Sequence, residues 1–132
     1  VTPGAFGVVV NLITGAVQDA WGDADTVSGI ERVTGTTFGD SILGGAESNR
    51  FNGRAGDDTL NGGLGGDYAE YGNATAGANV NLTTGVAQDG EGGTDQLISL
   101  ENVIGSGFAD TLTGVAQLGR SPSDLRGGAG ND

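Results

Sequence analysis

Acidic and amide side chains recur every nine residues in the middle of this sequence, each within a glycine-rich stretch. From Gly35 to Glu70 the successive nonapeptides are GTTFGDSIL, GGAESNRFN, GRAGDDTLN and GGLGGDYAE. The sixth place is occupied in turn by Asp40, Asn49, Asp58 and Asp67. Short side chains with oxygen atoms beside flexible turns suit the coordination of a hard cation. The spacing therefore predicts a series of metal sites.

The composition narrows the chemistry further. The 132 residues include no Cys and no His, which excludes disulfides, thiolate metal sites and the usual catalytic arrangements based on Ser-His or Cys-His. Seventeen Asp and Glu against five Lys and Arg give a net charge of -12, so nucleic acid and anionic membranes are poor partners. A solubilising acidic surface is the alternative explanation. Because 12 of the 17 acids are Asp, mostly beside glycines, we favour ordered cation binding. Without His or Cys, we expect that the chain is not an enzyme.

Each nonapeptide predicts about six residues of turn followed by about three residues of strand, with one apolar side chain directed inward. The eighth place holds Ile42, Phe51, Leu60 and Ala69 in turn. Two successive nonapeptides make one coil, and stacked coils form two parallel sheets around a narrow core. The predicted fold is therefore all-β, a parallel β-roll or β-helix solenoid without helices.

The 18-residue coil also predicts which turns share an ion. Asp40 pairs with Asp58, and Asn49 pairs with Asp67 at a weaker site because the amide adds no charge. Calcium suits the site because it accepts six to eight oxygens at about 2.3–2.6 Å in flexible geometry. Glycine is needed where the turn takes positive φ or where a Cβ would obstruct oxygens directed at the ion. The glycines in these roles are Gly35, Gly44, Gly53, Gly56, Gly62, Gly63 and Gly65.

The start of the chain aligns with its second half. The phrase VNLITG from Val10 to Gly15 returns as VNLTTG from Val80 to Gly85, and 16 of the 38 positions between Gly7 and Gly44 are identical under the same shift. We therefore expect one domain over 1–132 with two copies of a unit of about 70 residues, copy one at about 7–70 and a truncated copy two at about 77–132. We also expect the chain to be a segment of a longer repetitive protein, with neither a membrane span nor a signal peptide in this stretch.

The second copy supplies further candidates. Asp110 pairs with Asp132 if the Ser-Pro-Ser loop bulges outward from the stack. Asp25 and Asp95 lie in glycine-rich loops of the two lead segments that precede the nonapeptides, where we favour a solvated turn over ligation, as we do for Asp19, Asp23 and Asp89. Tyr68 and Tyr71 are expected to cap the stack where the Asp pattern ends.

The nonapeptides resemble the RTX, or haemolysin-type, calcium-binding family, well over Gly35 to Glu70 and partly over Gly105 to Asp132. The resemblance implies a bacterial protein exported by a type I system, unfolded at cytosolic calcium levels and folded outside the cell. We therefore expect a secreted or cell-surface module with a structural or adhesive role and calcium as its ligand. The expected further partners are a second copy of the chain, or a cell surface or polysaccharide. The alternatives are a self-assembling surface-layer or filament subunit, and a non-catalytic accessory module of a secreted protease or polysaccharide-modifying enzyme.

Overall fold

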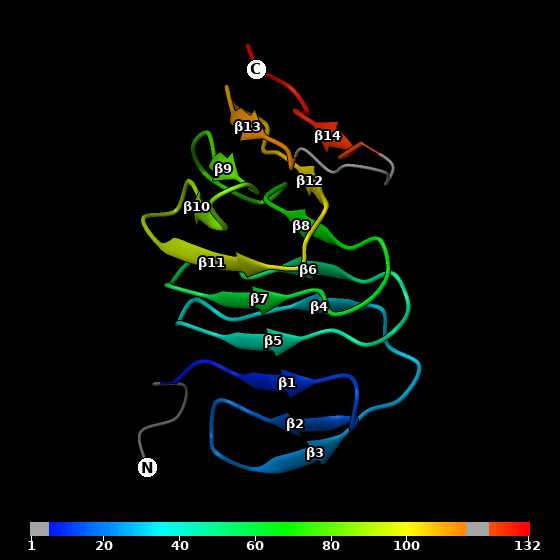
Figure 1. Cartoon of the computed structure of the whole chain (residues 1–132). Helices are drawn as coiled ribbons and strands as arrows, with labels where there is room; N and C mark the ends of the chain where they lie inside the picture. The colour runs from blue at the N-terminus through cyan, green and yellow to red at the C-terminus, as the bar shows by residue number, and fades with distance from the viewer. Residues whose placement is uncertain (1–5, 116–121) are drawn as a thin grey trace.

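The computed structural model describes residues 6–115 and 122–132, and these residues form fourteen short strands and no helix (Figure 1). Twelve of these strands contain three residues, and within the nonapeptides this length follows because the first six residues form a turn. The larger sheet contains, in spatial order, β13 (Thr111–Thr113), β9 (Asn79–Asn81), β10 (Val86–Gln88), β11 (Thr94–Ile98), β7 (Thr59–Asn61), β5 (Ser41–Leu43), β1 (Val9–Asn11), β2 (Ala16–Gln18) and β3 (Ala24–Thr26). The smaller sheet contains β14 (Leu125–Arg126), β12 (Asn102–Ile104), β8 (Tyr68–Glu70), β6 (Arg50–Asn52) and β4 (Arg32–Thr34).

The chain alternates between the two sheets through the nonapeptides, as expected for a β-roll. Strands β4, β6 and β8 lie in the smaller sheet, and β5 and β7 lie in the larger sheet. The neighbours within each sheet are parallel, with Ser41 opposite Thr59 and Arg50 opposite Tyr68. Each of these pairs joins equivalent places of two successive coils. The all-β class, the parallel sheets and the 18-residue coil predicted from the nonapeptides are therefore confirmed.

The lead segments depart from the purely parallel fold that the sequence predicts. Strands β1, β2 and β3 form an antiparallel meander, and so do β9, β10 and β11. The physical reason is the length of the connections, because a parallel neighbour requires a long crossover. In the first meander Asn11 Oδ1 accepts the amides of Ile13 and Thr14, and Gly15 follows with φ 72°. This tight turn reverses the chain within the same sheet.

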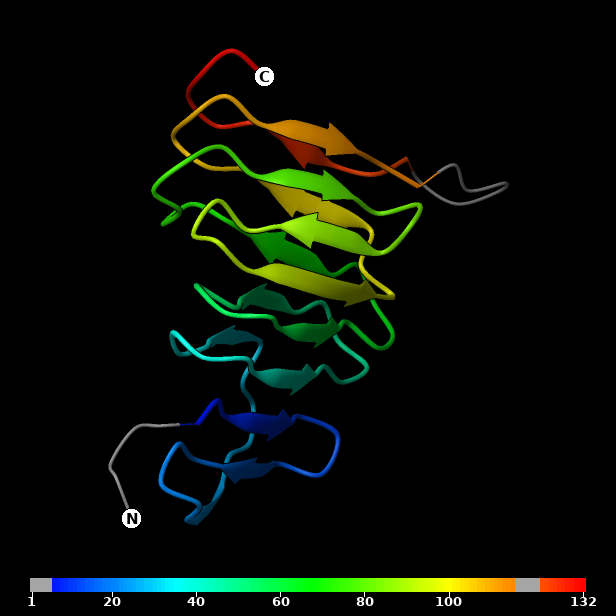
Figure 2. The ribbon, with the colours of Figure 1, turned by 90° about the vertical axis from the view of Figure 1, so that its left-hand side faces the viewer.

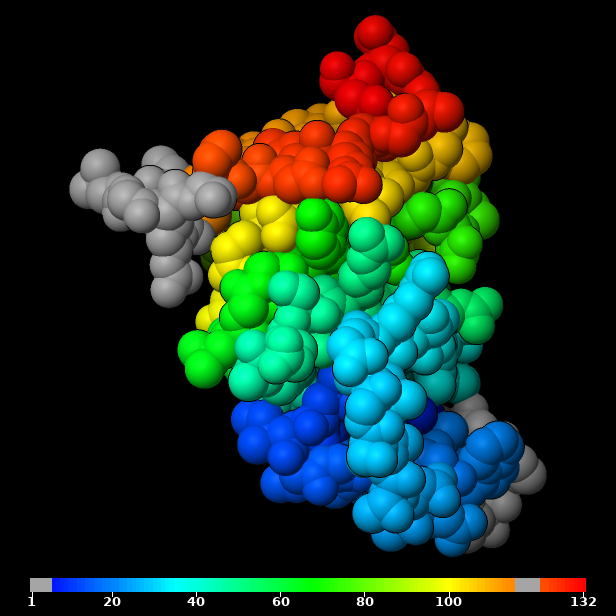
Figure 3. Space-filling view, turned by 90° about the vertical axis from the view of Figure 1, so that its right-hand side faces the viewer, coloured from blue at the N-terminus to red at the C-terminus, as the bar shows by residue number. Residues whose placement is uncertain are grey.

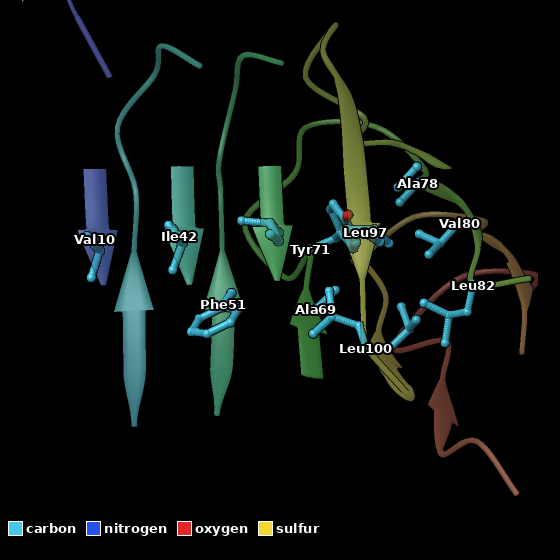
Figure 4. Packing of buried hydrophobic residues seen from close by; sticks show 13 residues of the cluster. Val10, Ile42, Phe51, Ala69, Tyr71, Ala78, Val80, Leu82, Leu97 and Leu100 are labelled. Carbon is cyan, nitrogen blue, oxygen red and sulfur yellow. The ribbon is translucent and has the colours of Figure 1, made fainter. Parts of the chain in front are cut away.

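The core is a pair of ladders of apolar residues between the two sheets (Figure 4). Ile42 and Leu60 face inward from the larger sheet and Phe51 and Ala69 from the smaller, each 1% exposed or less. The larger sheet continues the ladder in register, with Val10 below Ile42 and Leu97 above Leu60. The eighth place of every nonapeptide is thus a core position, as predicted, and the stack extends beyond the nonapeptides on both sides.

The stack is elongated, with β3 near one end and the last residues at the other (Figures 2 and 3). Tyr71, expected to cap the stack, is instead 4% exposed and lies beside Leu97 within the core (Figure 4). That expectation is wrong because the second lead segment adds strands above the nonapeptides. Within residues 6–115 and 122–132, no helix is present that is long and apolar enough to cross a membrane.

Candidate metal centres

The turns that precede the strands stack in the pairs that the 18-residue coil predicts. The amide of Asp40 donates to Asp58 Oδ1 at 2.7 Å, and the amide of Asn49 donates to Asp67 Oδ1 at 2.7 Å. Each bond joins the sixth residue of one turn to the sixth residue of the next turn in the same column. The acidic side chains are thereby held between successive turns and shielded from solvent.

The second copy contains one comparable pair. The amide of Asp110 donates to Asp132 Oδ1 at 3.0 Å, although the interrupted repeat makes their separation in sequence longer than one regular coil. The structure therefore places the two predicted partners together. Of the Ser-Pro-Ser loop expected to bulge outward, Ser121 lies outside the described residues, as do residues 116–120, so the bulge stays a prediction. Asp132 is exposed, unlike its counterparts Asp58 and Asp67.

Two of these buried carboxylates have an oxygen without a hydrogen-bond partner. Asp58 and Asp67 are 1% and 0% exposed, and Oδ2 of each is fully buried and unpartnered within the described residues. Burial, together with the charges of nearby carboxylates, Asp95 foremost, raises the pKa of Asp58 to about 8. Burial likewise raises the pKa of Asp67 to about 6. An unpartnered buried carboxylate is costly, so these positions require a proton or a cation.

The first glycine of each nonapeptide leaves room for these oxygens. A Cβ built at Gly62 would lie 2.5 Å from Asp67 Oδ2, and one at Gly44 would lie 2.6 Å from Asn49 Oδ1. At Gly53 the added atom would overlap the carboxylate of Asp58, and at Gly35 that of Asp40. None of these four glycines has positive φ. They are required because a side chain would occupy the space in front of the carboxylate.

A second group of glycines is required by backbone conformation. Gly56, Gly63 and Gly65 have φ of 114°, 88° and 125°, the left-handed region that other residues rarely adopt. They occupy the second or fourth place of their nonapeptides. Arg54, at the second place of its own nonapeptide, adopts φ of 71° without being glycine. The glycines chosen from the sequence therefore serve two distinct physical purposes.

The turns have two hydrogen-bonding patterns. In turns 35–40, 44–49 and 105–110 the side chain of the sixth residue accepts the amide of the second, as in the 2.6 Å bond from Thr36 to Asp40 Oδ2. In turns 53–58 and 62–67 the preceding Asn accepts that amide instead, Asn52 from Arg54 at 3.0 Å and Asn61 from Gly63 at 3.1 Å. This exchange leaves Oδ2 of the sixth-place Asp unpartnered. The predicted site of Asp40 with Asp58 and that of Asn49 with Asp67 each combine one turn of the first pattern with one turn of the second.

Backbone carbonyls must complete any coordination sphere here. Within the described residues, no three acidic side chains converge closely enough to hold a metal ion by themselves. Carbonyls do approach the carboxylates, since the Gly53 carbonyl oxygen and Asp40 Oδ2 both border the space at Gly35. A mixture of carboxylate and carbonyl oxygens is the donor set that Ca²⁺ accepts. The residues present therefore fit calcium.

The lead-segment candidates differ from one another. Asp25 is exposed on β3, whereas Asp95 is 0% exposed and accepts the amide of Asp58 at Oδ1 over 3.2 Å. Asp89 is 1% exposed. A solvated turn is therefore the wrong interpretation for Asp89 and Asp95, because the second lead segment is inserted into the middle of the stack. Asp25, in the first lead segment, is not brought together with another candidate.

The structure reveals a fifth nonapeptide that was missed from the sequence. Residues 90–98 are GEGGTDQLI, with Asp95 at the sixth place and Leu97 at the eighth, opposite Leu60. On the side of the smaller sheet, Glu101 accepts the amide of Asp67 at Oε2 over 3.1 Å, as Asp95 accepts the amide of Asp58. The signal for residues 90–98 was present in the spacing, but Glu91 replaces the second glycine. Glu101 has no such signal.

Comparison with known protein families supports the metal assignment. Residues 34–69 match the family model described as the RTX calcium-binding nonapeptide repeat (4 copies). A search of curated proteins found no match to the chain. The matched segment contains the predicted pairs Asp40 with Asp58 and Asn49 with Asp67, and it ends before Asp89 and Asp95.

Proposed function

From the match of residues 34–69 to the RTX calcium-binding nonapeptide-repeat family, we propose that this chain is a calcium-dependent structural module of a secreted or cell-surface bacterial protein. The observation that supports this most directly is the pair of buried, unpartnered oxygens Asp58 Oδ2 and Asp67 Oδ2. Without a cation their charges oppose folding, and with one they hold successive turns together. Calcium binding and folding are therefore the same event.

Folding coupled to calcium suits a chain that is exported before it folds. In the proposed sequence of events, low cytosolic calcium leaves the acidic turns repelling one another, and millimolar calcium outside the cell closes the stack. Extracellular calcium modules have dissociation constants of about 10⁻⁴–10⁻³ M, which matches that role. Type I secretion, an adhesive role and a non-catalytic function are parts of the same proposal.

The architecture is proposed to derive from duplication of a unit that includes one lead segment and the nonapeptides after it. The five strands from β1 to β5 correspond in order to the five strands from β9 to β13, with a constant offset between their first residues. The counterparts also repeat their pairing, since β1 pairs with β5 and β9 pairs with β13, both in parallel. Such a unit extends the stack by repetition.

The experiment is far-UV circular dichroism of the full chain during calcium titration. We expect little β signal in excess chelator, a cooperative gain at submillimolar to millimolar calcium, and no comparable gain with magnesium, which demands a smaller and more regular oxygen shell. The Asp23→Asn variant serves as a charge control because Asp23 is exposed. A chain that is equally ordered in chelator and in calcium would refute the proposal.

A second candidate function, end-to-end association, rests on the unpaired strands at the two ends of the larger sheet. Within the described residues, β3 and β13 each lack a neighbour on one side. An unpaired edge is a template for another strand, so one molecule's β13 end is proposed to pair with another molecule's β3 end. Sedimentation velocity over a range of protein concentrations in calcium tests this. Concentration-independent sedimentation as a monomer would exclude it.

A further inference from the structure

Asp89 is buried at the point where the second lead segment meets the nonapeptide stack. Its Oδ1 accepts the amides of Glu91 at 2.7 Å and Gly93 at 2.9 Å, which fixes the side chain within the turn that precedes β11. Its Oδ2 is fully buried and has no hydrogen-bond partner within the described residues. One carboxylate oxygen therefore has a structural role and the other has none.

The unpartnered oxygen faces the turn of the coil below. A Cβ built at Gly93 would lie 2.6 Å from Asp89 Oδ2 and would overlap the carbonyl oxygen of Gly56. The two oxygens thus border the same small space, one from each coil, and Gly93 leaves that space open. This is the arrangement seen at Gly35, where Asp40 Oδ2 and the Gly53 carbonyl border a predicted calcium site.

Three buried carboxylates lie near this junction, where the charges of Asp95 and Asp89 contribute to the raised pKa of Asp58. Asp58, Asp89 and Asp95 are 1%, 1% and 0% exposed. Asp95 is satisfied, because its Oδ1 accepts the Asp58 amide and its Oδ2 accepts the Tyr71 hydroxyl at 3.0 Å. Oδ2 of Asp58 and Oδ2 of Asp89, by contrast, accept no hydrogen bond from the described residues.

No basic side chain compensates this charge within the described residues, where the ion pairs join Arg32 and Arg50 to Glu70 and Arg126 to Asp124. A proton would supply one donor to this group of oxygens. A cation that accepts six to eight oxygens would satisfy Asp89 Oδ2 and the Gly56 carbonyl together.

We propose that Asp89 Oδ2 and the Gly56 carbonyl, together with further oxygens of these two turns, bind a further Ca²⁺, which fastens the second lead segment onto the nonapeptide stack. The proposal rests on the calcium-binding function proposed above and adds a site outside the matched repeats. It does not compete with the pair formed by Asp40 and Asp58, because neither of its two named oxygens belongs to that pair.

The first experiment compares Asp89→Asn with Asp19→Asn in calcium-binding calorimetry of the full chain. Asp19 is the counterpart of Asp89 in the first lead segment and accepts the equivalent amides, Trp21 at 2.9 Å and Asp23 at 2.8 Å, but no further coil formed by residues 6–115 or 122–132 stacks against it. Both substitutions preserve a side-chain oxygen for the turn. We expect Asp89→Asn to bind one calcium ion fewer per chain, or to bind that ion at least tenfold more weakly. We expect Asp19→Asn to match the wild type.

The second measurement uses terbium as a luminescent substitute for calcium and does not depend on the folding of the Asp89 variant. Because the Tyr71 hydroxyl contacts Asp95, an ion at the junction lies close to this phenol and receives its excitation energy. In a Trp21→Phe background, Tyr71→Phe should remove a large share of the tyrosine-sensitised emission. Asp89→Asn, where it folds, should remove the same share.

The results separate this site from the proposed function as a whole. Unchanged stoichiometry and affinity in a folded Asp89→Asn variant would overturn the junction site while leaving calcium-dependent folding intact. Terbium emission that does not change in Tyr71→Phe would also overturn it. A wild-type chain that binds no calcium would instead refute the proposed function, and the junction site with it.

Discussion

The backbone amide of Asp40 donates a 2.7 Å hydrogen bond to Oδ1 of Asp58, the residue 18 positions further along the chain. This bond aligns two turns of successive coils and buries the carboxylate of Asp58 between them. Because Oδ2 of Asp58 remains without a partner, the contact that orders the turns also creates a need for positive charge. The same relationship holds between Asn49 and Asp67, so the need recurs on the other edge of the stack.

Substitution of Asp58 by Asn should weaken calcium binding strongly. The Asn side chain keeps an oxygen that can accept the backbone amide of Asp40, but it removes the buried negative charge. Loss of a charged interaction of about 1.5–3 kcal/mol corresponds to roughly 10–100-fold in affinity. Calorimetry should show this loss for Asp58→Asn and almost none for Asp23→Asn, whose side chain is exposed. Equal effects of the two substitutions would contradict the assignment of Asp58 as a ligand.

Substitution of Asn49 by Asp should change stability in opposite directions with and without calcium. Asn49 is 2% exposed, and its backbone amide donates a hydrogen bond to Asp67 Oδ1. A carboxylate at position 49 therefore adds a second negative charge near a buried acid. Calcium gains a charged ligand and should bind more tightly, whereas the calcium-free chain should be less stable. The midpoint of a calcium titration checks the first sign, and the midpoint of thermal unfolding in chelator at mildly acidic pH, where protons replace part of the calcium, checks the second. Asn73→Asp, at an exposed position, adds the same charge and should leave both midpoints unchanged.

The nonapeptide spacing was sufficient to predict the coil, the core positions and the turn pairs. A short turn followed by a short strand leaves little freedom, so Ile42, Leu60 and their partners follow directly from their places in the repeat. Asp132 could also be assigned, because the sixth place and its glycines survive beyond the interruption. Local geometry repeated at a fixed interval determined these features.

The position of the second lead segment within the stack could not be predicted. Nothing in the sequence of β9, β10 and β11 indicates that this meander stacks on β7. The burial of Asp89 and Asp95 depends on that contact. A similar sequence around β3 leaves Asp25 exposed, because none of the strands that the structure describes lies beyond β3. Burial of these acids is thus a property of the neighbouring coil rather than of the local sequence.

Substitution of Gly53 by Ala should destabilise the calcium-bound chain, whereas Gly45→Ala should be tolerated. A Cβ at Gly53 would overlap the carboxylate of Asp58, and a Cβ at Gly45 would have no atom within 4 Å. Neither glycine has positive φ, so the comparison isolates the steric effect. We expect a loss of about 1–3 kcal/mol for Gly53→Ala, measured by urea unfolding in saturating calcium. Equal midpoints for the two variants would show that the space before Asp58 is not needed.

Acid should partly replace calcium in stabilising the fold. Burial raises the pKa of Asp58 to about 8 and that of Asp67 to about 6 in the folded chain, whereas an unfolded Asp has a pKa near 3.8. Between these values the folded chain binds more protons than the unfolded chain, so its stability without calcium falls as pH rises from about 4 to 8. In saturating calcium the same carboxylates are ionised and bound to the ion, so the affinity for calcium should rise over that range. The far-UV circular dichroism signal of the calcium-free chain at pH 4.5 and pH 7.5 measures the first effect, and calcium titrations at the same two pH values measure the second. The Asp58→Asn variant, which cannot ionise at that position, should show a weaker pH dependence without calcium. A calcium-free chain that becomes more stable as pH rises would contradict the burial of unpaired acids on which the calcium sites depend.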